Sequence, residues 1–175
     1  SNGNKIGCVF SNVNPSVAEV FDFNSTTGVI SNTISLQTNG SEYGIEFSPN
    51  NSKLYITNLS GIFQFDISSG NQATINSSKT QITTAGCVPG PLQLGPDGKI
   101  YVARCSNFLG VINSPNNLGV NCNYVNNSIN ISPATNNTSL PSFIAAYKDK
   151  NNKIQDSSAR LMENNNSSST PISFT

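Results

Sequence analysis

Short apolar runs bounded by polar turns recur along most of the chain, and the run at Val17–Asn24 also alternates with the period of a β-strand. The clearest runs are Lys5–Asn12, Val17–Asn24, Tyr43–Phe47, Lys53–Thr57 and Ile62–Ile67. Clusters of Gly, Pro, Asn and Ser separate them, among them the turn SPNNS that begins at Ser48. The pattern therefore predicts an all-β protein built of short antiparallel strands.

The stretch from Tyr43 to Ser69 returns in altered form further along the chain. Its SPNNSKLYIT matches the GPDGKIYVA that begins at Gly95, at a spacing of about 47 residues. A turn followed by Lys also opens the chain at Ser1–Lys5, so the first copy begins at its hairpin and lacks an innermost strand. Repeats of this length are typical of β-propeller blades, each a four-stranded antiparallel sheet. We predict blades over about 1–40, 41–86 and 87–135 and an extra inner strand over 140–147.

About three blades do not close a ring, because propellers use about four to eight. We therefore expect a β-propeller fragment whose remaining blades come from a longer parent chain or from another chain. Residues 148–175 are rich in Asn and Ser, which predicts a polar tail or linker.

Charge is scarce, since only 10% of the residues are charged, with nine basic and nine acidic side chains. No basic field is present to bind phosphates, so nucleic acid is not an expected partner. No run approaches the roughly 18 apolar residues of a membrane span. His is absent, which removes the commonest general base and the Ser-His-Asp and Cys-His nucleophile systems. Neither a CxxC spacing nor an EF-hand pattern occurs, and we expect no metal and no cofactor.

Cys87 and Cys105 flank the hairpin built on Gly95–Gly98. If pairing runs outward from this hairpin in regular register, Cys87 faces Ser106, and the two sulfurs miss each other by one step. A small bulge would bring them within the Cα separation of about 4.4 to 6.8 Å that a disulfide needs. We predict this bridge; the alternative is two buried thiols, which would fit a reducing compartment.

Glu46 and Gln93 occupy the same register in successive inner strands, each between two apolar residues. Inner strands line the channel of a propeller, so both are candidates for contact with a ligand there. The favoured alternative is hydrogen bonding to neighbouring blades or to channel water, because buried polar groups are usually satisfied in this way. Asp22 and Asp66 also correspond, each before a Ser/Thr-Gly turn, and we expect them to cap those turns.

Five segments together resemble a known family: YGIEFSPNNSKLYITN, IFQFDISSGN, LQLGPDGKIYVAR, FLGVINSPNNLGVNCNY and LPSFI. They are similar to the C-terminal blades of the large β-propeller of secreted multidomain proteins of Bacteroidetes, especially flavobacteria. Those proteins often carry PKD repeats and a gliding-motility or type IX secretion sorting domain. The resemblance covers Ser1 to about Tyr147. It implies a secreted or surface-exposed propeller, with seven blades in the parent, used for adhesion or display, and it supplies no catalytic residues.

Our first functional expectation is a non-catalytic binding or scaffold module, secreted or on the cell surface. Its loops would present a recognition surface to a protein or glycan from a rigid framework. One alternative is a carbohydrate-active enzyme, a lyase or glycosidase, that uses paired carboxylates. A second is a structural spacer in a surface fibre. Acidic residues are few and no pairing between them follows from the sequence, which favours the first reading.

Overall fold

The computed structural model describes residues 3–10, 17–38, 40–84, 90–136, 140, 147–148 and 154–155. Within these residues the chain forms 13 β-strands, one short α-helix and one 3-10 helix. The chain divides into two compact units, Ser1–Pro141 and Ser142–Thr175. The prediction of an all-β protein is confirmed.

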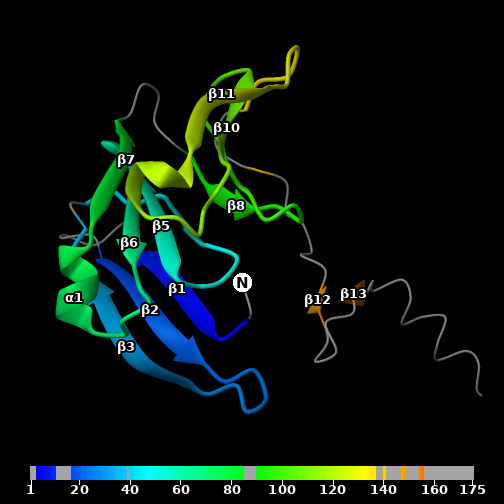
Figure 1. The fold of residues 1–175 in the computed structure, drawn as a ribbon. Helices are drawn as coiled ribbons and strands as arrows, with labels where there is room; N and C mark the ends of the chain where they lie inside the picture. Colours follow the sequence, from blue (N-terminus) through cyan, green and yellow to red (C-terminus); the bar gives the residue numbers. More distant parts are fainter. Residues whose placement is uncertain are drawn as a thin grey trace, which may run out of the picture. The chain divides into compact units, whose positions relative to one another are not determined.

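Three antiparallel sheets build the first unit (Figure 1). The first sheet has three strands, β1 (Lys5–Phe10), β2 (Val17–Phe23) and β3 (Ile30–Leu36). The second has four, β4 (Gly44–Phe47), β5 (Lys53–Asn58), β6 (Gly61–Asp66) and β7 (Thr80–Thr84). The third also has four, β8 (Leu92–Leu94), β9 (Ile100–Val102), β10 (Phe108–Ile112) and β11 (Tyr124–Asn130). Successive strands are neighbours in each sheet, and no sheet among the described residues closes on itself.

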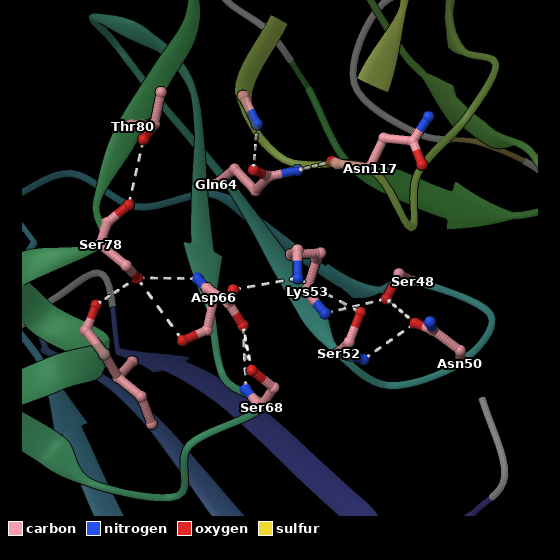
Figure 2. Close-up of polar contacts among 12 residues, drawn as sticks. Ser48, Asn50, Ser52, Lys53, Gln64, Asp66, Ser68, Ser78, Thr80 and Asn117 are labelled. Atoms are coloured by element: carbon pink, nitrogen blue, oxygen red, sulfur yellow. Dashed lines mark hydrogen bonds and ion pairs between the residues drawn. The ribbon is translucent and has the colours of Figure 1, made fainter. Parts of the chain in front are cut away.

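The turn between β4 and β5 forms where the sequence SPNNS predicts it. The Ser48 amide donates to the Lys53 carbonyl at 2.9 Å, and the Lys53 amide donates back to the Ser48 hydroxyl at 2.9 Å. Asn51 adopts the left-handed φ of 57° that Asn tolerates. The Asn50 side-chain oxygen accepts the Ser52 amide at 3.0 Å (Figure 2). Local side-chain hydrogen bonds therefore fix this hairpin.

The core consists of two apolar clusters, one on each face of the second sheet. Side chains alternate along a strand, so Leu54 and Ile56 enter one cluster and Tyr55 enters the other. The first cluster also includes Val20 and Leu36 of the first sheet, whereas the second includes residues of the third sheet. Because both faces of β5 are covered, all six of its residues are buried.

A short helix in the second sheet packs on the first. Helix α1 (Gln72–Ser77) lies between β6 and β7 and contacts β3 (Figure 1). Asn71 caps it, since its side-chain oxygen accepts the Thr74 amide at 3.0 Å. The sequence pattern did not predict this helix, whereas the fourth strand expected near Lys79–Thr83 is present as β7.

The second unit contains a two-stranded antiparallel pair, β12 (Tyr147–Lys148) with β13 (Ile154–Gln155). Most of the inner strand predicted over 140–147, and most of the tail predicted over 148–175, lies outside the described residues. Both therefore stay predictions.

Candidate functional site

A polar hollow of about 390 Å³ lies between strand residues of the first sheet and two turns of the second, one before β5 and one after β6. Lys5, Asp22, Asn50, Ser68 and Gly70 are among the residues that line it. A second hollow of about 410 Å³ shares Lys5, Asp22 and Gly70 with the first. Neutral hydrogen-bonding groups and a single ion pair therefore dominate this surface, which we call the polar hollow.

The ion pair joins two residues that face each other on β1 and β2. Lys5 and Asp22 are register partners, and the Lys5 Nζ lies 2.7 Å from the Asp22 Oδ1. Asn32 donates to the other carboxylate oxygen at 2.8 Å. The hydrogen bonds from Lys5 and Asn32 hold the pKa of Asp22 below its ordinary value. Both partners are partly exposed, so the pair contributes about 0 to 1 kcal/mol to stability.

The second sheet repeats this arrangement at the same register position. Lys53 faces Asp66, with 3.1 Å between the Lys53 Nζ and the Asp66 Oδ2. The Asp66 Oδ1 accepts the Ser68 amide at 3.1 Å and the Ser68 hydroxyl at 2.6 Å (Figure 2). Burial raises the pKa of Asp66, but the hydrogen bonds from Ser68 and Lys53 outweigh it, and the net pKa is lowered. Asp66 thus caps its turn as predicted.

The turn that follows Asp22 is capped differently from the prediction. The Asn24 side-chain oxygen accepts the amides of Thr26 and Thr27 at 3.0 and 3.1 Å. Asp22 instead binds Lys5 across the strands. The prediction for Asp22 was wrong because Asn24 stands closer to the turn and Asn is equally suited to it.

The third sheet departs from the Lys-Asp pattern. Lys99 occupies the place of Lys53, but continuing the register from Ile100 and Ile112 puts Asn113 opposite it. Lys99 pairs with Asp97 of its own turn at 3.8 Å instead. The Lys-Asp cross-strand pair therefore marks the first two sheets, which are the two that border the polar hollow.

Glu46 connects the second sheet to the third. Its Oε1 accepts the Phe47 amide and its Oε2 accepts the Leu94 amide, each at 2.9 Å. Burial raises the pKa of Glu46, and the two backbone hydrogen bonds partly offset this. Leu94 follows Gln93 on β8, where Gln93 pairs with Tyr101 of β9. The carboxylate is thus brought to the strand that carries Gln93, while a ligand-contacting role of either residue in a channel stays a prediction.

The predicted disulfide stays a prediction, because Cys87 lies outside the described residues. Cys105 follows β9 and has a left-handed φ of 49° in an exposed position. Cys122 is buried, and this burial raises the pKa of its thiol. A thiol with a raised pKa is a poor nucleophile near neutral pH, so Cys122 serves as a core residue.

A buried glutamine links the second and third sheets, and the sequence analysis missed it. The Gln64 Nε2 donates to the Tyr55 hydroxyl at 2.6 Å and to the Asn117 carbonyl at 2.7 Å, and its Oε1 accepts the Gly119 amide at 2.8 Å. The Tyr55 hydroxyl in turn donates to the Pro115 carbonyl at 2.8 Å. Figure 2 shows the Gln64 amide directed at the connection between β10 and β11. The available signal was a polar residue inside the apolar run IFQFD.

In the part of the chain that the structure describes, no three His, Cys, Asp or Glu side chains are grouped as a metal ion requires. Nor is any helix there long and apolar enough to cross a bilayer. The sequence matches no protein-family model and none of the curated proteins with which it was compared. The function is therefore argued from the sheets, the polar hollow and the state of the carboxylates.

Proposed function

We propose that this chain is part of a β-propeller that serves as a non-catalytic binding or scaffold module, secreted or on the cell surface. The propeller is supported by repetition in the packing of the sheets. β1 contacts β4 as β5 contacts β8, and β4 also contacts β8. Sheets that pack face to face with their inner strands adjacent are the arrangement of propeller blades. The secreted or surface location rests on the family resemblance and on the scarcity of charge.

The observation that carries the binding function is the polar hollow between two rigid sheets. Its asparagine and serine side chains offer donors and acceptors, and the Lys5–Asp22 pair adds one fixed charge of each sign. Such a surface suits a neutral, hydroxyl-rich or amide-rich ligand, that is, a glycan or an exposed peptide segment. The two turns of the second sheet that line it are held by local hydrogen bonds, which limits the entropy lost on binding.

The state of three described carboxylates, those of Asp22, Glu46 and Asp66, favours binding over hydrolysis. Glycoside hydrolysis needs one carboxyl group that donates a proton and a second that acts as base or nucleophile. Asp22 and Asp66 are kept ionised by lysines, and Glu46 accepts two backbone amides. Asp22 and Asp66 are therefore not poised to donate a proton to a ligand, and both carboxylate oxygens of Glu46 are engaged by backbone amides of its own sheet and the next.

Binding of the full chain to a glycan array and to a panel of surface proteins tests this proposal. Thr33 lines the second hollow, is exposed and makes no side-chain hydrogen bond to the described residues, so Thr33→Arg fills the site without breaking one. We expect this variant to weaken binding at least about tenfold. Thr84→Arg is the matched control, because Thr84 is also exposed on an outer strand but lies outside both hollows. Turnover of a bound polysaccharide would contradict the proposal, and absence of any ligand would favour a structural spacer.

A further inference from the structure

The inner edge of β1 differs from the corresponding edges in the other two sheets. β1 corresponds to β5, because Lys5 faces Asp22 as Lys53 faces Asp66. β5 is paired on its inner side by β4, and β9 is paired there by β8. Among the described residues no strand pairs with the inner side of β1.

The hydrogen-bonding directions in the second sheet show which peptide groups this edge presents. The Ser48 amide bonds to the Lys53 carbonyl, and alternate residues of an antiparallel strand point to the same neighbour. The peptide groups of Lys53, Tyr55 and Thr57 therefore point to β4. Their equivalents in β1 are Lys5, Gly7 and Val9.

The hydrogen bonds within the first sheet assign the same peptide groups to the inner edge independently. The Phe23 amide donates to the Asn4 carbonyl at 2.8 Å, so the peptide groups of Asn4, Ile6 and Cys8 point to β2. Those of Lys5, Gly7 and Val9 point to the inner edge. Two separate observations thus assign the same three residues to this edge.

Exposure follows the same pattern. Five of the six residues of β1 are half-buried and Phe10 is exposed, whereas all six residues of β5 are buried. An edge with unpaired peptide groups is a template for another strand, and proteins usually cover or block it.

The occupants of the equivalent places have a shared chemistry. β4 contains Ile45-Glu46-Phe47 and β8 contains Leu92-Gln93-Leu94, so each has Glu or Gln between two apolar residues. Glu46 uses its carboxylate to accept the amides of Phe47 and Leu94, which belong to two successive inner strands. Main-chain pairing is therefore common to both inner strands, and in β4 an acceptor side chain adds a contact to the next sheet.

We propose that the inner edge of β1 binds one antiparallel extended segment of a partner polypeptide with an apolar–Glu/Gln–apolar pattern. This inference rests on the propeller arrangement proposed above and names the partner that completes the first sheet. Main-chain hydrogen bonds to Lys5, Gly7 and Val9 supply the affinity, and the alternating side chains supply the specificity. The middle Glu or Gln approaches β4, just as Glu46 approaches β8.

A labelled synthetic peptide with the sequence of residues 41–48, SEYGIEFS, serves as the probe for the full chain. We expect saturable binding by fluorescence anisotropy. Amide hydrogen exchange at Lys5, Gly7 and Val9 is fast in the free chain and slows on binding, whereas Ile6 and Cys8, already paired with β2, change little. Two further peptides carry N-methyl groups at alternate residues, on one set or on the other. Strand addition predicts that only one of them loses affinity, by at least about tenfold.

Three results would overturn the proposal: slow exchange of the three edge amides in the free chain, no binding of the peptide, or equal binding of the two methylated peptides. Lys5 lines both hollows, but Gly7 and Val9 lie outside them, so the Thr33→Arg variant separates the polar hollow from most of the β1 edge. Peptide binding should be unchanged in that variant. Loss of peptide binding in both the native chain and the variant, with glycan or protein binding retained in the native chain, would reject the strand site alone.

Discussion

At the scale of single residues, buried polar side chains determine how neighbouring sheets are held. Gln64 and Glu46 each reach from the second sheet to backbone groups of the third. Without these two side chains, the backbone amides and the carbonyl group that they bind would lose a hydrogen-bond partner. A buried unsatisfied polar group costs about 1 to 3 kcal/mol, which is a large fraction of the stability of a small domain.

Gln64→Leu should lower the free energy of unfolding by about 3 kcal/mol. The leucine keeps a similar volume but leaves the Asn117 carbonyl and the Gly119 amide without their partner. Gln93→Leu is the matched control, because Gln93 is half-buried on β8 and its side chain makes no hydrogen bond to the described residues; we expect a change below about 1 kcal/mol. Urea denaturation followed by circular dichroism measures both. Equal effects of the two substitutions would contradict the role of Gln64.

Glu46 should make a pH-dependent contribution of unfavourable sign near neutrality. Because burial raises its folded-state pKa, the stability it contributes is present below the unfolded pKa and is lost as the pH rises through the folded pKa. The stability of the native chain relative to Glu46→Gln should therefore fall between about pH 4 and pH 7, since the variant does not titrate there. Urea midpoints across this range measure the difference.

Asp22 should show the opposite pH dependence of stability in the same measurement. Its pKa is lowered by hydrogen bonds from Lys5 and Asn32, so its contribution is present above the unfolded pKa and is lost as the pH falls through the folded pKa. Asp22→Asn should thus approach the native stability on acidification, over a range of about 0 to 1 kcal/mol because the pair is partly exposed. Parallel pH profiles for the two variants would show that the assigned causes are wrong.

At the scale of elements, turns and edges decide whether each sheet forms and stays separate. The outer edge of β3 is covered by side-chain amides of α1. The Gln72 oxygen accepts the Ser35 amide at 3.0 Å, while Asn76 accepts the Gln37 amide at 2.7 Å and donates to the Ser35 carbonyl at 3.1 Å. These groups replace the hydrogen bonds that another strand would make, which protects an exposed edge. The 3-10 helix η1 (Gly119–Cys122) contacts β7 in the corresponding place.

Gly61→Ala should be among the most destabilising substitutions in the chain, at more than about 3 kcal/mol. Gly61 opens β6 after a two-residue turn with a φ of 143°, and an added Cβ would overlap the Thr83 carbonyl oxygen of β7. Gly70→Ala is the control: its φ is 66° and an added Cβ meets no atom within 4 Å. We expect about 1 kcal/mol there, from backbone conformation alone. Thermal unfolding of the two variants compares them, and similar losses would contradict the steric account.

At the scale of the whole molecule, the sequence predicted strands and turns but did not predict the contacts between sheets. The apolar, β-branched run at Lys53–Thr57 and the turn SPNNS predicted a strand and a hairpin correctly because these depend on neighbouring residues. The sequence pattern did not predict helix α1, because its Asn- and Ser-rich sequence has weak helix propensity. Its side chains form hydrogen bonds with the edge of the first sheet at Ser35 and Gln37, a contact that no local pattern shows. The role of Gln64 depends on groups 53 and 55 residues away in sequence. The polar hollow likewise joins residues from both sheets and carries no local signature.

The packing of the three sheets predicts how local stability is distributed through the first unit. Among the described residues the first sheet shares an apolar cluster with the second, and the second shares another with the third, so the middle sheet has clusters on both faces and the two outer sheets each have one. Opening β5 disrupts both clusters together with the Tyr55–Gln64 hydrogen bond, whereas opening β11 exposes a strand that is already largely exposed. Native-state hydrogen exchange should therefore find the highest opening free energy at β5 and a low one at β11. Slower exchange in β11 than in β5 would mean that the third sheet is stabilised by groups beyond those described.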